Sequence, residues 1–547
     1  GCAPAAVSEY RFANSAPVWR VDDRRPVAKP TNPGFAKLLY FFDRFAVRRL
    51  TRTMELRAPR HAANVNSVDE VPDSTWFRNR IGMHPLGPDA IARGPGSGAG
   101  RPDLSEPLTI TGTKVGGVTV GFLAEDRRGV KYLIKFDRQG LPEIETGANV
   151  VIQRLMWAAG FHVPEDDVIT LRRDQMILAE DAEVADTFGN TRPMTEDDLE
   201  RALTRVDRSP DGSYRALASK FLAGVPLGGV SPEGVRADDP NDVVPHEERR
   251  ELRGQYVLFS WVGHTDVKFD NMLDMWIEDP RDPRIRYVKH YLVDFGNGLG
   301  TLGVVENRDN DGFAYSFDLE YMARSLVAVG LWRRPWEGVS PPPLVGVGRI
   351  DAEHFQPGSW RPQFPWTPFN RRDRHDGLWG AKIVARFSPA HIRAAVRAGA
   401  YSDPRTTEYI VQTLIDRRDK IIRYWFYQVT PIDRPEMVVV GSDAGVVGGA
   451  GDGVGNSAAE VLCFRDLALT YGLTAMARPS YRVRLHDFHG RALAAPATVY
   501  PEVWPDPTPG PDRGRVCTPA LTTGRDAEGY TIVKITPSRT GAAVLPV

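Results

Sequence analysis

The chain has 547 residues, the length of roughly three to four domains, and 42% of them are hydrophobic, which is enough to bury a large core. Its formal net charge of −1 gives no overall electrostatic attraction to nucleic acid, so the sequence predicts no nucleic-acid partner. The sequence contains no run of about 18 apolar residues, so it predicts no helix that spans a membrane.

The chain begins Gly1-Cys2-Ala-Pro, which resembles the end of a bacterial lipoprotein signal, where a small residue precedes the cysteine that becomes lipidated. Each buried CH₂ of an acyl chain contributes about 0.8 kcal/mol to membrane binding. We therefore expect a lipid anchor at Cys2 and a location in the cell envelope, as an outer-membrane lipoprotein that faces the periplasm or the cell surface. The alternative is a vector-derived glycine followed by a chance cysteine.

Residues 1–107 are predicted to form an extension that holds a tether, a helix and loops. Apolar residues recur at steps of three and four over 34–56, and arginines fill the remaining positions, which indicates a basic amphipathic helix. Such a helix either lies on anionic headgroups or packs its apolar face against the neighbouring domain. Residues 86–106 are rich in Gly and Pro and are expected to be exposed.

Residues 108–190 predict an amino-terminal lobe. Alternating β-branched and polar residues, with glycines at the turns, predict strands at about 108–112, 117–124 and 130–136. The spacing of apolar residues predicts a helix over 145–160, which Gly160 ends. Two further short strands are expected after this helix.

Residues 191–435 predict a helical carboxy-terminal lobe, with 195–225 and 247–263 mostly helical. The glycine-rich stretch 436–457 has no lysine of a phosphate-binding loop, so it is predicted to be a linker. Short strands over 458–547 predict a small β domain. Cys463 and Cys517 lie in that domain, and they are either a disulfide pair, as an oxidising compartment would allow, or two free thiols.

The most informative motif is His264-x-Asp266-x-Lys268-x-x-Asn271, which has the spacing of the catalytic loop of protein kinases. Asp294-Phe295-Gly296 follows it, after an apolar strand. Asp266 would accept the proton of an attacking hydroxyl group, and Lys268 would contact the γ-phosphate of ATP. Asn271 and Asp294 supply the oxygen ligands that Mg²⁺ prefers. ATP and Mg²⁺ are therefore the expected cofactors.

Upstream residues complete the predicted nucleotide site. Lys135 lies on a predicted strand and would bind the α- and β-phosphates, held by an acidic partner that is either Glu145 or Glu143, with Glu145 favoured because it lies at the start of the helix. The loop that contains Lys114, Gly116 and Gly117 lies between the first two strands. Its backbone amides could cradle phosphates, although its glycine spacing is not that of a kinase glycine-rich loop and a plain hairpin turn would look the same.

These motifs resemble those of atypical bacterial kinase-like proteins of the HipA and CotH type, over roughly residues 108–430. The run from KFDRQGLPEIETGANVV to WAAGFHVPEDD is similar to the lysine strand, acidic residue and helix of HipA-type kinases. The resemblance implies an α+β, two-lobed protein-kinase-like fold and phosphorylation of a hydroxyl group. Three features depart from ordinary kinases: a longer gap between Asp266 and Asp294, no Ala-Pro-Glu motif after Gly296, and an acidic partner of Lys135 that the sequence does not assign.

Two hypotheses follow for the function. The first is an ATP-dependent phosphotransferase that acts on a protein or a small molecule, in an envelope-anchored lipoprotein. The second is a catalytically inactive kinase-like lipoprotein that binds a protein partner or supports an assembly at the cell surface, since ATP is scarce outside the inner membrane. The presence of Asp266, Asn271 and Asp294 together favours the first hypothesis. No segment predicts the substrate.

Overall fold

The computed structural model describes residues 15–32, 60–96, 100–114, 119–185, 190–301, 309–329, 331–340, 342–440, 459–473, 479–487, 491–501, 513–519, 521 and 531–538. Cys2, the predicted helix 34–56, and Gly116 and Gly117 lie outside the described residues. The chain divides into a larger unit, residues 18–65 and 71–422, and a smaller unit that contains residues 423–547. No helix in the described ranges is both long and apolar enough to cross a membrane.

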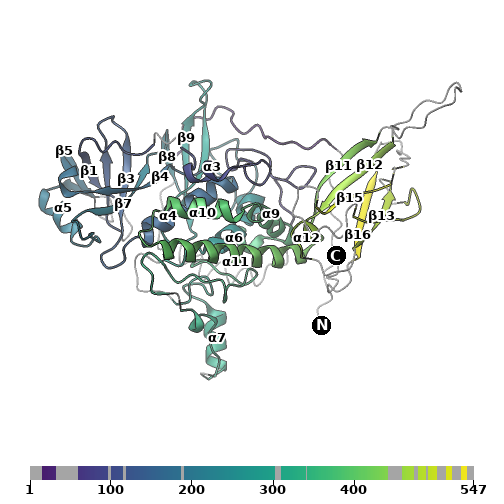
Figure 1. Ribbon diagram of the computed structural model, residues 1–547. Helices are drawn as coiled ribbons and strands as arrows, with labels where there is room; N and C mark the ends of the chain where they lie inside the picture. Colours follow the sequence, from purple (N-terminus) through teal and green to yellow (C-terminus); the bar gives the residue numbers. More distant parts are fainter. Residues whose placement is uncertain are drawn as a thin grey trace, which may run out of the picture. The chain divides into compact units, whose positions relative to one another are not determined.

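The amino-terminal lobe of the larger unit is built on a seven-stranded sheet (Figure 1). Its strand order is β4-β7-β3-β2-β1-β5-β6, and β1 to β3 form an antiparallel meander. The strands are β1 (Leu108–Thr113), β2 (Gly121–Glu125), β3 (Lys131–Phe136), β4 (Asp166–Leu171), β5 (Met176–Ala185), β6 (Thr191–Pro193) and β7 (Tyr214–Lys220).

The alternation within β3 decides which residues face the core. Tyr132, Ile134 and Phe136 are buried in the main apolar cluster of this lobe, because alternate side chains of a strand point to opposite faces. Lys135 therefore belongs to the other face of β3. The predicted meander is present, and its lysine has the orientation that a binding site requires.

Strand β7 corrects the expectation that 195–225 is mostly helical. Only α5 (Glu196–Leu203) is a helix there, whereas β7 pairs with both β3 and β4. The Ala-rich segment of β7 favours a helix by propensity, but pairing on both sides satisfies its backbone and overrides that preference. The sheet thus continues beyond residue 190, where the sequence suggested that this lobe ends.

Helix α4 (Ile144–Ala159) is almost wholly buried and follows the meander directly. It ends at Gly160, whose φ of 133° is accessible mainly to glycine, as the sequence predicted. Helices α3 (Pro88–Arg93) and α10 (Pro389–Ala398) both contact α4. Part of the amino-terminal extension therefore packs on α4 and α10.

The second lobe is mainly helical and contains one small sheet. Helix α6 (Arg250–Val262) packs against α9 (Arg374–Ala385) and precedes the motif at His264. Strands β8 (Val225–Gly228), β9 (Met272–Glu278) and β10 (Arg286–Leu292) form the antiparallel sheet β10-β9-β8. The β9–β10 hairpin fills the long gap between Asp266 and Asp294. The remaining helices are α7 (Leu319–Val327), α8 (Thr367–Arg371) and α11 (Pro404–Gln428).

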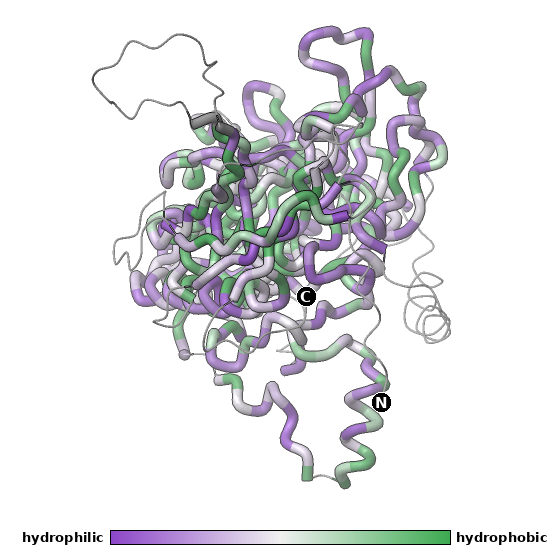
Figure 2. The backbone as a smooth tube through the Cα atoms, turned by 90° about the vertical axis from the view of Figure 1, so that its right-hand side faces the viewer, coloured by the Kyte–Doolittle hydropathy of each residue, from purple (hydrophilic) through white to green (hydrophobic). Residues whose placement is uncertain are grey.

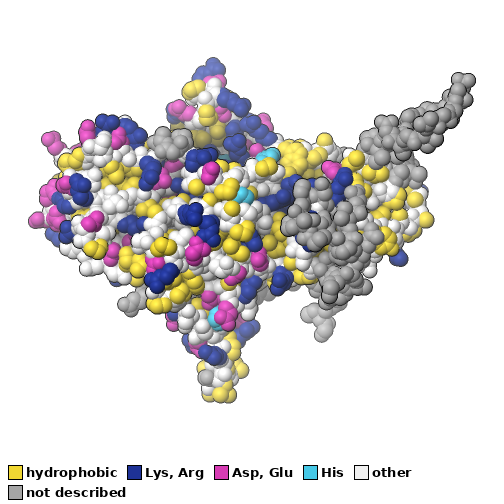
Figure 3. All heavy atoms as spheres, viewed as in Figure 1, with side chains coloured by type: hydrophobic (Ala, Val, Ile, Leu, Met, Phe, Trp, Pro, Cys, Tyr) yellow, Lys and Arg dark blue, Asp and Glu magenta, His cyan; other side chains and the backbone are white. Residues whose placement is uncertain are grey.

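Helix α7 projects from this lobe (Figure 1) and carries apolar residues along its length (Figure 2). Leu326 and Val327 are more than four-fifths exposed, and yellow apolar atoms form the tip of the projection in Figure 3. The rest of the face in Figure 3 mixes acidic and basic side chains, in keeping with the net charge near zero.

The smaller unit contains two three-stranded sheets, β11-β12-β15 and β14-β13-β16. Their strands are β11 (Ile432–Val440), β12 (Ala459–Asp466), β13 (Ser480–His486), β14 (Ala497–Val499), β15 (Arg515–Cys517) and β16 (Ile532–Ser538), and α12 (Leu467–Thr470) follows β12. Both sheets contribute to one apolar cluster, and Cys463 and Cys517 form a disulfide between β12 and β15. Strand β11 includes residues 436–440 of the predicted linker, and residues 441–457 lie outside the described ranges.

Candidate active site

A cavity of about 200 Å³ lies where the sheet of the first lobe meets the loops of the second. It receives side chains from six parts of the chain: the β1–β2 connection, β3, α4, β7 and the two motifs at residues 264–271 and 294–297. The residues that line it are Lys114, Thr119, Lys135, Phe136, Glu145, Thr146, Asn149, Leu217, Asp266, Lys268, Asp294, Gly296 and Asn297. The structure therefore brings six of the predicted charged site residues into one cavity.

Lys135 and Asp294 form the central ion pair of the cavity. Lys135 Nζ donates to Asp294 Oδ1 at 2.8 Å. Burial alone would lower the pKa of Lys135, but Asp294 outweighs burial and raises it. Burial would likewise raise the pKa of Asp294, yet Lys135, Lys114 and Lys268 together lower it. Both groups are therefore charged at neutral pH.

Asp294 also has an unusual backbone conformation, with a φ of 61°. Non-glycine residues rarely adopt this left-handed region, and such strain is typical of functional sites. The carboxylate of Asp294 is 43% exposed into the cavity while its lysine partner is 13% exposed. Asp294 thus offers a free oxygen to a ligand while its other oxygen holds Lys135.

Glu145 lines the cavity but does not bond Lys135. Thr119 Oγ1 donates to its carboxylate at 3.1 Å. Burial, reinforced by the negative charge of Asp137, raises the pKa of Glu145 to about 7, although Thr119 and Lys135 lower it. Near neutral pH this side chain can gain or lose a proton.

Asp137 fixes the start of α4, and through it the position of Glu145. Its Oδ1 accepts the backbone amides of Glu145 and Thr146 at 2.9 and 3.0 Å, and its Oδ2 accepts the Thr146 hydroxyl at 2.6 Å. A carboxylate at a helix N-terminus satisfies amides that have no partner within the helix. Asp137 follows β3 directly, so this one residue links the strand that carries Lys135 to the helix that carries Glu145.

Glu143, the other candidate partner of Lys135, does not line the cavity. Its Oε2 accepts the backbone amide of Ser402 at 2.9 Å. Of the two glutamates, only Glu145 faces Lys135, while the ion pair in the structure is formed by Asp294 instead. The prediction that a glutamate pairs with Lys135 therefore differs from the observed geometry, because Thr119 engages Glu145 and Asp294 lies nearer.

Lys114 is the described part of the predicted phosphate loop. It lines the cavity, and burial together with the charge of Lys135 lowers its pKa. Gly121 packs against its side chain, because a Cβ at Gly121 would lie 3.3 Å from Lys114 Cδ. Lys114 is thus a third lysine in the cavity, beside Lys135 and Lys268, and the role of Gly116 and Gly117 stays a prediction.

Asp266 and Lys268 lie side by side in the loop after α6. Asp266 Oδ2 accepts from Lys268 Nζ at 2.8 Å and from Asn297 Nδ2 at 3.0 Å. Burial lowers the pKa of Lys268, but Asp266 and Asp270 outweigh it and raise that pKa. The carboxylate of Asp266 is therefore oriented by two donors.

Asn271 lies behind this loop rather than in the cavity wall. Its Nδ2 donates to the backbone carbonyl of Asp266 at 2.7 Å, which closes the loop and its final 3₁₀ turn, Phe269–Asn271. Its own carbonyl accepts the amide of Val293 at 3.1 Å, next to Asp294. Asn271 therefore connects the Asp266 loop to the segment that carries Asp294. These hydrogen bonds explain its position without a metal ion, and its role as a metal ligand stays a prediction.

Buried side chains pack against the two motifs and hold them in place. His264 packs edge-on against Phe259, and its ring lies 5.8 Å from that of Phe295. Burial lowers the pKa of His264 to about 4, so its ring is neutral at physiological pH. Asn149 Oδ1 accepts the Phe295 amide at 2.9 Å, while its Nδ2 donates to the buried Asp166 at 2.6 Å. Helix α4 therefore holds the segment that carries Asp294.

Sequence reasoning missed four residues that shape this site: Thr119, Asp137, Asn149 and Asn297. Three of them had a usable signal. Asp137 directly follows the lysine strand, Asn149 lies one helical turn after Glu145, and Asn297 follows the Asp-Phe-Gly triplet. Thr119 lies in a connection without a motif, so its contact with Glu145 depends on the fold alone.

A second cluster, His61, Asp373 and His375, has the composition of a metal site but a structural role. Asp373 Oδ1 accepts the backbone amides of His375 and Asp376 and caps α9. Arg250 lies 3.0 Å from His61 Nε2, so a cation already occupies the neighbourhood. This cluster lies outside the cavity described above.

The chain matches no protein-family model, and no curated protein matches it. It is similar in structure to the Golgi casein kinase, crystallised with Mn and ADP, with 11% identity and a TM-score of 0.28 over 59% of this chain and 73% of that one. The Rio2 kinase complex with ADP, Mg²⁺ and phosphoaspartate from Chaetomium thermophilum matches with 12% identity and a TM-score of 0.22, over 56% and 70% of the two chains. Another crystal structure of the Golgi casein kinase matches with 11% identity and a TM-score of 0.29, over 74% of this chain and 95% of that one.

The fold follows from the chain's own elements. An antiparallel meander presents Lys135, a helix after it presents Glu145, and a helix-loop-hairpin brings Asp266 and Asp294 to the same cavity. The chain has an α+β, two-lobed protein-kinase-like fold, with an amino-terminal extension and a small carboxy-terminal β domain.

Proposed function

We propose that the chain is a kinase-like phosphotransferase that uses ATP and Mg²⁺ to phosphorylate a hydroxyl group of a protein or a small molecule. One observation carries the proposal: three lysines and three carboxylates from distant parts of the sequence line a single cavity. Perturbed titratable groups that converge in a cavity are typical of active sites.

The charges of the cavity fit a polyphosphate with a divalent cation. Lys114, Lys135 and Lys268 would neutralise phosphate oxygens, which is the main task of a protein in phosphoryl transfer. The exposed oxygen of Asp294 is a hard ligand of the kind that Mg²⁺ prefers. The bound ion would supply charge neutralisation of the transferred phosphoryl group.

Asp266 would act on the acceptor hydroxyl. Its carboxylate is held by Lys268 and Asn297, so it keeps one orientation relative to the cavity. A positioned carboxylate within hydrogen-bond reach of a hydroxyl can orient it and accept its proton. Lys268, on the same loop, would then neutralise the phosphate that the hydroxyl attacks.

The proposal is tested first by nucleotide binding to the full-length protein. We expect Mg²⁺ with ATP or ADP to raise the melting temperature of the wild type, and Asp294→Asn to abolish the shift. A matched control is Asp279→Asn, which removes the same charge in the turn between β9 and β10 and should keep the shift. A wild type that responds to no nucleotide would contradict the proposal and favour an inactive binding module.

Turnover is tested separately with labelled ATP. Asp266→Asn should retain the Mg-nucleotide shift but lose autophosphorylation and ATP hydrolysis, because it keeps the shape of the side chain and removes the proton acceptor. If the wild type binds nucleotide and never transfers phosphate, the chain is a nucleotide-dependent binding protein. If Asp266→Asn transferred phosphate as fast as the wild type does, Asp266 would not be the proton acceptor.

Envelope anchoring is a further part of this proposal and is independent of the site. A lipid on Cys2 would tether the protein to a membrane, where a partner protein or an envelope component would be its substrate. Mass spectrometry of protein taken from its native membrane tests the anchor. An unmodified Cys2 in that sample would remove it.

A further inference from the structure

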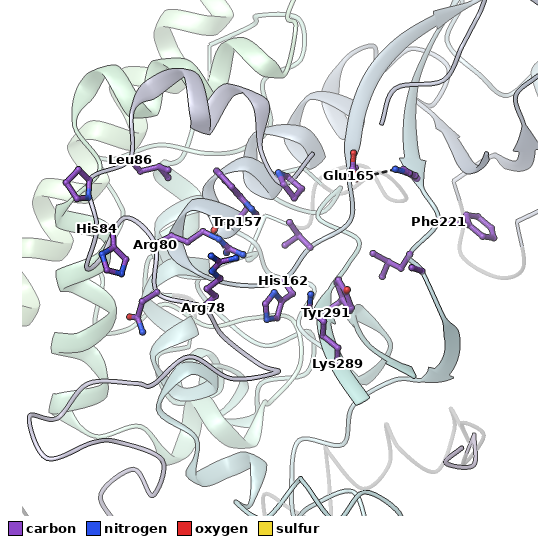
Figure 4. Close-up of a pocket in the computed structure, with 17 residues that line it drawn as sticks. Arg78, Arg80, His84, Leu86, Trp157, His162, Glu165, Phe221, Lys289 and Tyr291 are labelled. Carbon is purple, nitrogen blue, oxygen red and sulfur yellow. Dashed lines mark hydrogen bonds and ion pairs between the residues drawn. The ribbon is translucent and has the colours of Figure 1, made fainter. Parts of the chain in front are cut away.

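The larger unit contains another cavity, of about 610 Å³, which is not lined by Lys135, Asp266 or Asp294. Its walls come from the extension at residues 78–95, the end of α4, residues 162–165, residues 220–223 and β10. Its volume lies in the range of small-molecule sites, about 300–1,000 Å³. Figure 4 shows the residues that line this cavity.

The charge of this pocket is strongly positive. Arg78, Arg80, Lys220 and Lys289 line it, and Glu165 is the one acidic residue among the described residues of its wall. Glu165 is already paired, because its Oε1 lies 3.3 Å from Lys220 Nζ. In Figure 4 this pair lies apart from the group formed by the two arginines and Lys289.

Lys289 is the most informative residue of this group. It is partly buried on β10, and among the described residues the charges that act on it are those of arginines, with no carboxylate. Burial, together with the charges of Arg24, Arg80 and Arg78, lowers the pKa of Lys289 to about 8. A buried cation that faces other cations is unfavourable unless an anion accompanies it.

Arg80 is held in place for binding. Its guanidinium donates to the backbone carbonyls of Trp157 and Phe161, at 2.5 and 2.9 Å, and lies 5.2 Å from the centre of the Trp157 ring. Burial and the charge of Arg78 lower its pKa to about 10, against the opposing effect of Asp73. Carbonyl partners orient the arginine without neutralising it, so its charge remains for a ligand.

Aromatic and neutral polar groups complete the wall. Trp157 and Tyr291 offer apolar faces, and Lys289 lies 5.0 Å from the centre of the Tyr291 ring. Burial and the charges of Lys289 and Arg80 hold the pKa of His162 well below its usual value, so His162 is a neutral hydrogen-bonding group. A ligand with an organic part and a strongly anionic part would use both kinds of surface.

We propose that this pocket binds a small organic phosphate with at least two negative charges, at a site separate from the catalytic cavity. Arginine and lysine side chains that converge without carboxylates are the donors that phosphate oxygens require. The occupant would be a soluble phosphorylated compound, since the pocket is a walled cavity of limited volume.

The pocket and the catalytic cavity share two structural elements. Helix α4 places Glu145 in the catalytic cavity and Trp157 in the pocket, about 18 Å apart along the helix at 1.5 Å per residue. Strand β7 contributes Leu217 to one and Lys220 to the other. A phosphate compound in the pocket therefore contacts the same helix and strand that build the predicted nucleotide site.

The test uses isothermal titration calorimetry of the full-length protein with pyrophosphate, in the absence of Mg²⁺. We expect binding that weakens at least tenfold in Lys289→Met and in Arg78→Ala. Arg78 is exposed, so its removal leaves the fold intact and separates lost binding from lost folding. Lys131→Met, which removes an exposed lysine on β3, is the matched control and should bind as the wild type does.

A further variant separates this site from the catalytic cavity, which also contains lysines. Lys114→Met should retain the pyrophosphate binding that Lys289→Met loses. Binding that is lost in Lys114→Met and kept in both Lys289→Met and Arg78→Ala would overturn the proposal and assign the anion to the catalytic cavity. The absence of any pyrophosphate binding by the wild type would also overturn it, whatever the result of the kinase assays.

Discussion

Replacing Glu145 with glutamine should stabilise the protein above neutral pH while it weakens nucleotide binding. Glu145 is 7% exposed, and its carboxylate lies close to the negative charge of Asp137. Its pKa rises from 4.5 to about 7 on folding because burial penalises the charged form. Glutamine has the same shape, can still accept the Thr119 hydroxyl, and removes the charge.

The expected gain follows from the difference between the two pKa values. One pKa unit corresponds to 1.36 kcal/mol, so the ionised glutamate costs roughly 3 kcal/mol of stability above pH 7. Between pH 4.5 and 7 the folded state binds more protons than the unfolded state, so the stability of the wild type falls as the pH rises. Glu145→Gln lacks this dependence. Its advantage should be near zero at pH 4.5 and reach its full size above pH 7.

Thermal unfolding at several pH values measures this difference. For a folding unit of the size of the larger one, about 3 kcal/mol corresponds to roughly 3–4 °C in melting temperature at pH 8. Glu143→Gln is the matched control, because that carboxylate bonds the Ser402 amide outside the cavity. A Glu145→Gln protein that is less stable than the wild type at pH 8, or whose difference does not change with pH, would refute the reasoning.

Two further predictions test other parts of the structure. Lys289→Met should raise stability at pH 7 by about 3 kcal/mol, because the pKa of this lysine falls from 10.5 to about 8 on folding. The gain should shrink as the pH rises from 8 to 10.5, where the unfolded wild type binds more protons than the folded one. A gain in thermal unfolding that stays constant over this range would contradict the assignment. Asn149→Leu removes the hydrogen bonds that Asn149 makes to the Phe295 amide and to Asp166, and should lower the free energy of unfolding by about 3 kcal/mol. Hydrogen exchange of the Phe295 amide should become faster. Unchanged protection of that amide would show that α4 does not hold this segment.

Much of the fold and of the charged site could be predicted from the sequence because the signals are local. Buried and less buried residues alternate along β3, and α4 has regularly spaced apolar residues and a terminal glycine. The spacing of Asp266, Lys268 and Asp294 is that of a known catalytic motif. These features depend on near neighbours in the chain. The structure therefore places these residues in the elements that the pattern predicts.

The remaining features depend on contacts between distant segments. The helical propensity of the Ala-rich β7 gives no hint that β3 and β4 will pair with it. The pairing of Lys135 with Asp294 rather than with a glutamate is decided by the distance between residues far apart in the sequence. The pocket around Lys289 combines five segments of the chain, and only the fold brings them together.

The β9–β10 hairpin has a consequence for how this chain can be modified. The Val293 amide bonds the Asn271 carbonyl at the base of the hairpin, so the two strands leave and return at one point. The length of the hairpin is therefore independent of the distance between Asp266 and Asp294. Residues 279–285, in the turn, offer a place to insert a reporter peptide or a fluorophore without altering the loop that carries Asp266, since surface turns tolerate insertions at little structural cost.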